Sequence, residues 1–406
     1  MNAPSKIDML AAVRLTREGR LDDAMAVLRG ALSKASPDQA ASNVEAESPT
    51  SILGGVSLPK ISLPKGLLPK GLLPKGLSPK GFGDLVQGLG RRRPAPVLDL
   101  GLDKPVDALK AFLAPEPECV PIAMPDGSRF EQRDFANAAG SRAYKLFVPS
   151  GYAGQSLPLV VMLHGCTQSP DDFAAGTRMN EIAEEQGFLV AYPGQPQSAN
   201  VGKCWNWFNA RDQLRDHGEP SLIAGITRQI MAEFPVDPAR VYIAGLSAGG
   251  AAAATMGSLY PDLYAAIGVH SGLACGAASD MSSAFAAMKQ GVSPAAKARR
   301  RDSNGVAVPA IVFHGDSDAT VHPANGDEVI VQAKAGADLR VEVSREQDYT
   351  RTIHADESGR PVAEHWVLHG AGHAWSGGSA AGTYTNPRGP DASRAMMRFF
   401  AHHRIR

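Results

Sequence analysis

From about Gly140 onward, short apolar runs alternate with amphipathic stretches of helical periodicity. The apolar runs, which we predict to be strands, are Arg142–Val148, Leu159–Leu163, Phe188–Tyr192, Arg240–Ala244, Ala265–Val269, Ala310–Phe313 and His365–Leu368. The predicted helices are Ser221–Phe234, Ala248–Leu259, Asp327–Ala335 and Asp391–His402. This alternation predicts an α/β fold with a mainly parallel sheet flanked by helices. Arg142–Val148 is expected at an edge of the sheet because Pro149 closes it.

The first part of the chain follows a different pattern. Residues 5–33 carry apolar side chains at helical spacing on both sides of Gly19, which predicts a small helical hairpin. A five-residue repeat follows, with a Pro-Lys pair at Pro59, Pro64, Pro69, Pro74 and Pro79. Proline at every fifth position excludes a regular helix, so an extended spacer is expected. The predicted organisation is a hairpin at 1–33, a largely disordered linker at 34–117 and an α/β domain at 118–406.

Charge and composition narrow the range of partners. Lys+Arg and Asp+Glu both number 41, so the net charge is zero and nothing draws the whole chain toward nucleic acid. The leucines and lysines of the Pro-Lys repeat could contact an anionic or apolar surface, such as a granule, but a stiff solvated spacer is the favoured explanation. No apolar run approaches the roughly 18 residues of a transmembrane segment.

The N-terminus does not have the pattern of a signal peptide. Arg14, Arg17 and Glu18 interrupt every apolar stretch in which a secretory signal would lie. The sequence by itself therefore predicts a cytoplasmic protein.

The cysteines give no sign of a metal site. Cys119, Cys166, Cys204 and Cys275 are far apart and form no C-x-x-C pair. No dinucleotide fingerprint is present either, so neither a metal nor another cofactor is expected. Four cysteines allow three full pairings, and in the cytosol reduced thiols are the default.

The segment Gly245-Leu246-Ser247-Ala248-Gly249-Gly250 lies between a predicted buried strand and the Ala-rich start of a predicted helix. In this context a G-x-S-x-G turn presents a serine nucleophile, because the glycines leave room for a sharp strand-to-helix turn. The N-terminus of the helix also brings backbone N–H groups and a partial positive charge to the reacting centre. We therefore predict Ser247 as a nucleophile. The alternative is a tight turn that serves packing alone.

A serine hydroxyl needs a base to take its proton, and the base needs an acid to orient it. In this type of fold the acid follows the serine along the chain. Asp316 and Asp318 both come after the strand Ala310–Phe313, at the edge of the sheet where active sites form. We favour Asp318 because it lies deeper in the loop, and expect Asp316 to make local turn hydrogen bonds.

The base is predicted to be His373, which lies in a glycine-rich loop after the strand His365–Leu368. His365 and His369 are competing candidates, but they lie in the strand or at its end. The order Ser247, Asp318, His373 is the one expected for this type of fold.

Two further features concern substrate. An oxyanion needs two donors, for which the N–H groups of Ala248 and Cys166 are the candidates. The aromatic cluster of residues 204–208 could line an acyl or polymer pocket, or could be core packing under a loop. The candidate substrate-binding residues are Trp205, Trp207, Trp375 and His164.

Five of these segments together resemble the polyhydroxybutyrate depolymerase family of esterases, which is similar to feruloyl and acetylxylan esterases. They are LHGCTQ at 163–168, CWNWF at 204–208, GLSAGG at 245–250, HGDSDATV at 314–321 and GAGHAWSGG at 370–378. The resemblance covers roughly residues 140–403 and implies an α/β-hydrolase fold that cleaves carboxylic esters without a cofactor. It implies the same roles for Ser247, Asp318, His373 and Cys166. Many relatives are secreted and carry disulfides, whereas this chain shows no signal peptide.

The expected function is therefore hydrolysis of carboxylic esters through an acyl-enzyme, most simply on oligomers or polymers of 3-hydroxybutyrate. Feruloyl or acetyl esters of polysaccharides and small esters are alternatives on the same site. Peptide hydrolysis is a different chemistry on the same fold, but an exopeptidase would need a site for a charged terminus, and the sequence shows no clear one. A granule- or surface-binding protein with a vestigial hydrolase domain is the alternative from another class.

Overall fold

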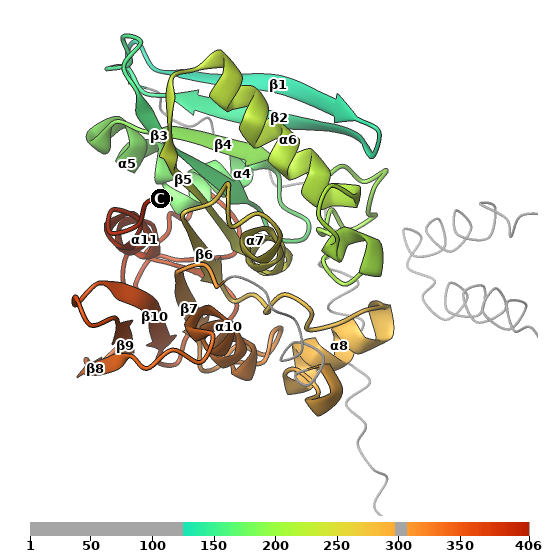
Figure 1. Ribbon diagram of the computed structural model, residues 1–406, viewed down its shortest axis with the longest axis vertical. Coiled ribbons are helices and arrows are strands. Elements are labelled where there is room, and N and C mark those ends of the chain that lie inside the picture. The colour runs from blue at the N-terminus through green and yellow to red at the C-terminus, as the bar shows by residue number, and fades with distance from the viewer. Residues whose placement is uncertain (1–124, 297–306, 406) are drawn as a thin grey trace, which may run out of the picture. The chain divides into compact units, whose positions relative to one another are not determined.

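The computed structural model describes residues 125–296 and 307–405 (Figure 1). The predicted hairpin at 1–33, the linker at 34–117 and both of their boundaries lie outside these residues. The described residues contain a ten-stranded sheet in the order β1-β2-β4-β3-β5-β6-β7-β10-β9-β8. From β4 to β10 in this order neighbouring strands are parallel, and the strands at both ends are antiparallel. The predicted α/β fold with a mainly parallel sheet is confirmed.

Every predicted strand is present, and three more complete the sheet. The strands are β1 (Arg129–Asn137), β2 (Gly140–Val148), β3 (Leu157–Leu163), β4 (Leu189–Pro193), β5 (Val236–Leu246), β6 (Ala266–His270), β7 (Ala310–Gly315), β8 (Arg340–Arg345), β9 (Tyr349–Ala355) and β10 (Pro361–Leu368). The prediction that Arg142–Val148 is an edge strand was wrong, because β1 pairs with β2 along its whole length. Polar residues dominate the exposed strands β1 and β8, so no apolar run marked them in the sequence.

The helices lie between the strands, as predicted, but several were missed. They are α4 (Pro170–Thr177), α5 (Met179–Gln186), α6 (Gly218–Glu233), α7 (Ala248–Leu259), α8 (Met281–Gln290), α10 (Ala324–Lys334) and α11 (Ala392–Phe400), with a 3₁₀ turn, η1, at Ala210–Gln213. The missed helices α4 and α5 have eight residues each, too few for a clear helical period. A separate pair of short strands, β11 (Trp375–Ser376) and β12 (Thr385–Asn386), lies between β10 and α11.

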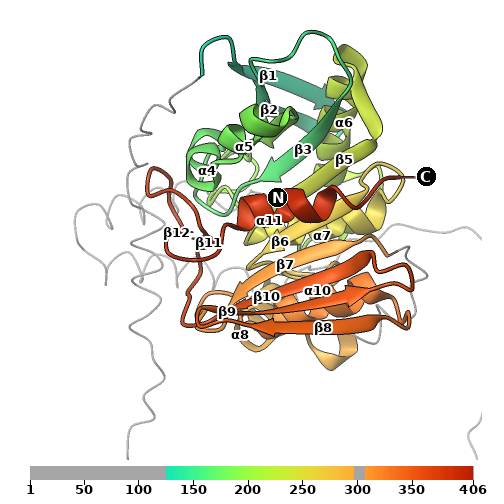
Figure 2. The same ribbon diagram turned by 90° about the vertical axis from the view of Figure 1, so that its left-hand side faces the viewer.

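The sheet separates two hydrophobic cores. Along β3 the buried side chains of Leu159, Val161 and Leu163 pack with α6, α7 and α10 on one face. Those of Val160 and Met162 pack with α4, α5 and α11 on the other, and Figure 2 shows α11 in front of the sheet. Because successive strand residues point to opposite faces, a continuous apolar run is needed where both faces are covered.

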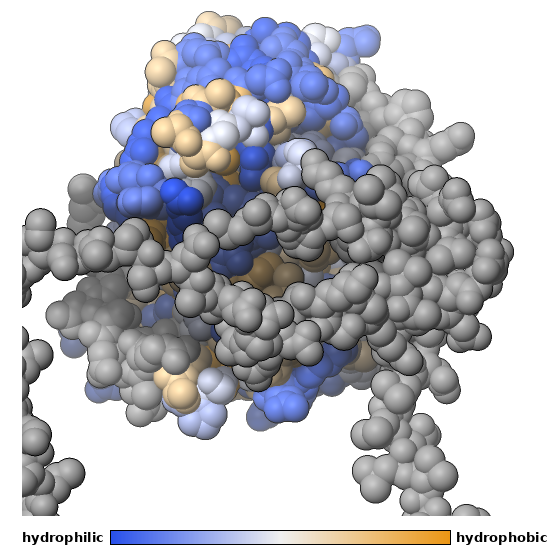
Figure 3. Space-filling view, turned by 90° about the vertical axis from the view of Figure 1, so that its right-hand side faces the viewer, coloured by the Kyte–Doolittle hydropathy of each residue, from blue (hydrophilic) through white to orange (hydrophobic). Residues whose placement is uncertain are grey.

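Most of the apolar side chains among the described residues are buried in these two cores. Where described residues are visible in Figure 3, the surface is mostly hydrophilic and its hydrophobic residues form small groups. Within residues 125–296 and 307–405, no helix has the length and apolar character needed to cross a membrane.

Candidate active site

Ser247 occupies a strained turn between β5 and α7. Its backbone angles are φ 58° and ψ −119°, outside the regions that non-glycine residues normally adopt. The glycines around it are sterically required. A Cβ atom on Gly249 would lie 2.0 Å from the carbonyl oxygen of Leu163, and one on Gly245 would lie 2.4 Å from the backbone of Gly249. Strain of this kind is found at functional sites, where the surrounding structure enforces it.

The structure brings Asp318 and His373 together. Asp318 follows β7 and His373 follows β10, its parallel neighbour, and the His373 Nδ1 atom lies 2.7 Å from the Asp318 Oδ2 atom. The other carboxylate oxygen, Oδ1, accepts hydrogen bonds from the N–H groups of Thr320 and Val321, each 2.9 Å long. Both carboxylate oxygens of Asp318 therefore have hydrogen-bond partners: Oδ1 accepts from the backbone of its own loop, and Oδ2 contacts the His373 imidazole.

Burial by itself would raise the pKa of Asp318. The hydrogen bond and charge of His373, together with the Val321 N–H, outweigh this effect and lower the pKa below its usual value. Asp318 is therefore ionised at neutral pH and accepts a hydrogen bond from His373. With Nδ1 held in this way, the Nε2 atom of His373 is the one left to exchange a proton with a reactant.

Ser247 and the Asp318–His373 pair share one neighbour, His270, at the end of β6. The Ser247 N–H donates to the His270 carbonyl oxygen at 2.9 Å. The charges of His373 and Asp318 act on the buried His270 ring, whose pKa burial lowers to about 3. Because β5, β6, β7 and β10 are parallel, their carboxyl ends meet at one edge of the sheet. All three predicted residues follow strands at this edge.

The loop after β3 lies against Ser247, where the predicted oxyanion donor Cys166 was expected. A Cβ atom on Gly165 would lie 3.6 Å from the Cβ atom of Ser247. The N–H groups of Cys166 and Ala248 have no hydrogen-bond acceptor among the described residues. Ala248 is the first residue of α7, whose initial N–H groups lack partners within the helix. Both groups are therefore free to bind an anionic oxygen.

The side chain of Gln168 stabilises the loop after β3 by hydrogen bonds. Its Oε1 atom accepts the Gly165 N–H at 2.9 Å, and its Nε2 group donates to Asp172 at 2.8 Å. Asp172, which lies in α4, also accepts hydrogen bonds from the N–H and the hydroxyl of Thr383. The loop after β3, which carries the candidate oxyanion donor Cys166, is thereby connected to the segment between β11 and β12.

A disulfide joins Cys166 to Cys204, 38 residues further along the chain. It ties the loop after β3 to the loop after β4. The expectation of reduced thiols is wrong for this pair. Disulfides persist mainly in oxidising compartments.

The predicted substrate-binding residues are buried. The indole N–H of Trp205 donates to the His164 carbonyl oxygen at 3.1 Å, and Trp207 packs edge-on against Phe208. Trp375 lies between His270 and Phe173 in the core, on the opposite side of the sheet from Trp205. Of the two readings of residues 204–208, core packing is therefore the one that the burial favours.

His164 is also buried, and both of its ring nitrogens have partners. Its Nε2 atom accepts the Gln195 N–H at 3.0 Å, and its Nδ1 atom lies 2.7 Å from the Gly165 carbonyl oxygen. Burial lowers the pKa of His164 to about 4, so the ring is neutral at neutral pH. These contacts place His164 under the oxyanion loop, where it fixes the backbone of Gly165.

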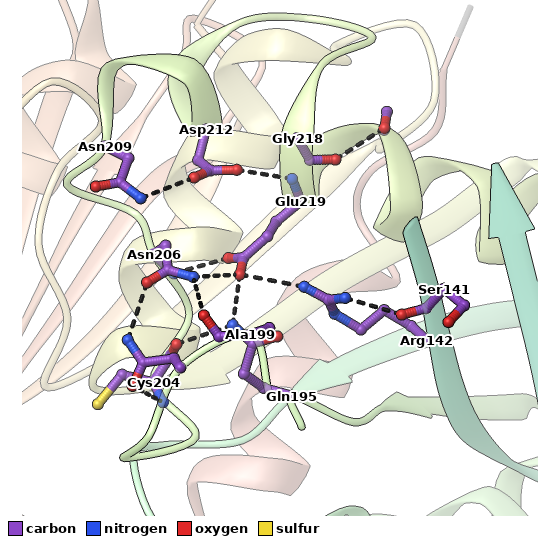
Figure 4. Close-up of polar contacts among 12 residues, drawn as sticks. Ser141, Arg142, Gln195, Ala199, Cys204, Asn206, Asn209, Asp212, Gly218 and Glu219 are labelled. Carbon is purple, nitrogen blue, oxygen red and sulfur yellow. Dashed lines mark hydrogen bonds and ion pairs between the residues drawn. The ribbon is translucent and has the colours of Figure 1, made fainter. Parts of the chain in front are cut away.

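A buried charged cluster beside the disulfide was not predicted (Figure 4). Glu219, near the start of α6, accepts hydrogen bonds from the N–H and side-chain amide of Asn206, both 2.7 Å long. It also accepts a hydrogen bond from Gln195 and lies 3.3 Å from Arg142. Burial raises the pKa of Glu219 above its usual value. The cluster anchors residues 195–206, and with them Cys204.

Tyr384 is a second residue that sequence reasoning missed. It lies between β11 and β12, and its ring is 6.5 Å from the His373 ring in an edge-on arrangement. It belongs to no predicted strand and to none of the recognised motifs, so the sequence gave no sign that it lies beside His373. In the described part of the chain, no cluster of three or more His, Cys, Asp or Glu side chains has a metal-binding arrangement.

Comparison with known proteins relates part of this chain to ester-cleaving enzymes. Residues 142–341 match the family described as Esterase PHB depolymerase. The resemblance to polyhydroxybutyrate depolymerase esterases is confirmed. The chain is 34% identical over 250 residues to poly(3-hydroxyalkanoate) depolymerase C of Paucimonas lemoignei. The aligned stretch covers 59% of this chain and 60% of that protein. It is also 27% identical over 211 residues to a probable acetylxylan esterase A of Neosartorya fischeri. That aligned stretch covers 48% of this chain and 56% of the esterase.

A solved structure supports the fold. The acetyl xylan esterase from Aspergillus awamori superposes with a TM-score of 0.54 at 21% identity, covering 68% of this chain and 99% of that one. The predicted α/β-hydrolase fold is therefore confirmed. The chain spans less than two thirds of the length of the two curated relatives, both of which carry the names of ester-cleaving enzymes.

Proposed function

We propose that this protein hydrolyses carboxylic esters through a serine acyl-enzyme. The observation that carries the proposal is the hydrogen-bonded pair of buried Asp318 and partly buried His373, at the same sheet edge as the strained turn of Ser247. A packing turn alone would need neither the strained serine nor an ionised carboxylate held against an imidazole. The family match and the names of the relatives support the same chemistry.

The reaction has two acyl-transfer steps. In the first, His373 takes the proton of the Ser247 hydroxyl as its oxygen bonds to the ester carbonyl carbon. The same proton then passes to the departing alcohol. In the second step, His373 takes a proton from water as the water oxygen bonds to the acyl carbon. The same proton then passes to the Ser247 oxygen as its bond to the acyl group breaks and the acid is released. Asp318 fixes the imidazole tautomer and stabilises the imidazolium that forms in each step.

The oxyanion of each tetrahedral intermediate accepts hydrogen bonds from the N–H groups of Cys166 and Ala248. The N-terminus of α7 adds a partial positive charge on the same side. Loss of one such donor typically costs about 2.7–4 kcal/mol of transition-state stabilisation. His164, Gln168 and the disulfide matter in this proposal because they hold the backbone of residues 165 and 166.

For the substrate we propose oligomers or polymers of a 3-hydroxyalkanoate, as in the name of the Paucimonas lemoignei relative. An acetylated polysaccharide is the second candidate, because a relative named acetylxylan esterase matches 48% of the chain. A granule- or surface-binding protein with an inactive hydrolase domain remains the alternative from another class. Surface contact through the Pro-Lys repeat belongs to this proposal and concerns residues outside the described part of the chain.

The test is hydrolysis of p-nitrophenyl acetate, methyl ferulate, acetylated xylan and 3-hydroxybutyrate oligomers by the wild type and by Ser247→Ala. We expect the wild type to cleave the oligomers, and Ser247→Ala to lose turnover while keeping its melting temperature. A fluorophosphonate probe should label the wild type and not the variant. A folded wild type that neither labels nor cleaves any ester would overturn the enzyme proposal in favour of a binding protein.

A further inference from the structure

Tyr384 combines backbone strain with an exposed aromatic ring. Its φ of 51° lies in the left-handed region, which a residue with a large side chain rarely adopts. About 40% of its surface is exposed, so burial of the ring does not enforce this conformation. Strain of this kind costs on the order of 1–3 kcal/mol and persists only where the surrounding structure imposes it.

The neighbours of Tyr384 impose its conformation. Its carbonyl oxygen accepts the Trp375 N–H at 2.7 Å, which pairs β11 with β12. The preceding residue, Thr383, is tied by hydrogen bonds to Asp172 and to the side chain of Gln168. The segment that carries Tyr384 is therefore fixed to α4 and to the oxyanion loop.

This anchoring sets the Tyr384 side chain against His373 and Thr167. One contact of Tyr384 is the edge-on ring of His373, at 6.5 Å between centroids. The other is Thr167, the residue after Cys166, whose Oγ1 atom lies 3.4 Å from the phenol oxygen. A substrate ester held between His373 and the Cys166 N–H would lie beside this ring.

The phenol has a hydrogen-bond donor to spare. Thr167 has one hydroxyl proton, and its Oγ1 atom donates to the Cys166 carbonyl oxygen at 2.6 Å. The phenol must therefore be the donor in the 3.4 Å contact with Thr167. That distance exceeds the usual range of about 2.5–3.0 Å for O–H···O bonds. The phenol O–H can thus turn to a better acceptor on a bound molecule.

We propose that Tyr384 is a specificity-determining residue that contacts the substrate. Its ring packs against the chain of the ester, and its O–H donates to a second oxygen beside the scissile ester. A 3-hydroxyalkanoate oligomer offers such an oxygen in the carbonyl of the next unit, whereas a simple acetyl ester of a phenol does not. This inference rests on the proposed function, and it assigns Tyr384 no proton transfer.

The experiment compares Tyr384→Phe and the wild type on 3-hydroxybutyrate trimer and on p-nitrophenyl acetate. Removal of one neutral hydrogen bond should lower kcat/KM for the trimer about 3- to 10-fold, chiefly through KM. Activity on p-nitrophenyl acetate should stay within about 2-fold, and the pH profile of kcat should not move. Tyr384→Ala should lose more on the trimer, because the ring is also removed. Tyr152→Phe is the matched control, since Tyr152 precedes β3 and lies at the other edge of the sheet.

Two results would overturn the inference. In the first, Tyr384→Phe and Tyr384→Ala match the wild type on both esters. In the second, Tyr384→Phe loses activity equally on both, which would mean that the phenol acts on the common chemistry and not on substrate choice. Failure of the proposed function would look different, because the wild type would then cleave neither ester and Ser247→Ala would change nothing.

Discussion

Two Asp–His pairs join the same two loops of this protein, the one after β7 and the one after β10. In one pair the His373 Nδ1 atom lies 2.7 Å from Asp318, and the side chains are 11% and 0% exposed. In the other, the His369 Nδ1 atom lies 3.2 Å from Asp316, and the side chains are 38% and 41% exposed. Both pairs consist of an aspartate from the β7 loop and a histidine from the β10 loop. They differ mainly in how exposed the side chains are and in which residues surround them.

The surroundings separate a pair that is shielded from water from one at the surface. Around Asp318 the carboxylate is shielded from water, so its interaction with the imidazole is little screened. Around Asp316 solvent screens the charges, and the carboxylate also accepts the Gly370 N–H at 2.7 Å. Asp316 thus fastens the β10 loop that carries His373. Besides the predicted local contact, here with Ser317, Asp316 thus has partners on a second loop.

The two pairs should differ most in how much kcat falls when their aspartate is replaced. Asp318→Asn keeps the shape of the side chain but removes the charge that holds the His373 tautomer and stabilises the imidazolium. We expect kcat to fall about 10⁴-fold, the size of loss seen when the acid of a serine triad is made an amide. The measurement is steady-state hydrolysis of p-nitrophenyl acetate, with circular dichroism to establish folding. A folded variant that retains a tenth of wild-type kcat would remove Asp318 from the mechanism.

A second contrast should appear in the dependence of stability on pH. The neutral rings of His270 and His164 lie beside the buried pair and under the oxyanion loop, and burial lowers their pKa values to about 3 and about 4. In the unfolded chain they take up protons below about pH 6.5. Stability is therefore complete above pH 6.5 and is lost as the pH falls from 6.5 toward 4, by up to about 1.4 kcal/mol per pH unit for each histidine.

Urea unfolding at pH 7, 5.5 and 4.5 measures this loss. His164→Gln should be less stable than the wild type at pH 7 but lose less on acidification. The matched control is His369→Gln in the exposed pair, which should keep the wild-type pH dependence. A free energy of unfolding that is flat from pH 7 to 4.5 would mean that the buried rings are not held neutral.

The smallest effects are expected in the exposed pair itself. Asp316→Asn and His369→Gln each remove a solvent-screened contact, and exposed ion pairs contribute at most about 1 kcal/mol. We expect each variant to lose less than about 1 kcal/mol of unfolding free energy and to keep kcat within about 3-fold. A hundredfold loss of kcat in Asp316→Asn would mean that the two pairs had been assigned the wrong way round.

The sequence by itself determined the fold class and the residues at the edge of the sheet. A strand in which every residue is apolar buries all its side chains when helices cover both faces of the sheet. In β3, for example, Leu159 and Val160 are buried on opposite faces. Parallel strands bring their carboxyl ends to one edge, so residues that follow different strands, such as Ser247 and His373, could be grouped without coordinates. Their roles in catalysis remain proposals.

Only the tertiary structure decided which of these residues are buried and what they contact. Asp316 and Asp318 are two positions apart, and their order in the loop favoured Asp318 as the acid. Their exposure and their partners are known only from the structure. Trp205 and Trp375 lie beside the site in sequence but have their rings in the core, while Tyr384 reaches the site from a loop without a motif. The physical reason is the same in each case. Burial and contact depend on segments far apart in the chain, and a periodic pattern records only which face of its own element a residue occupies.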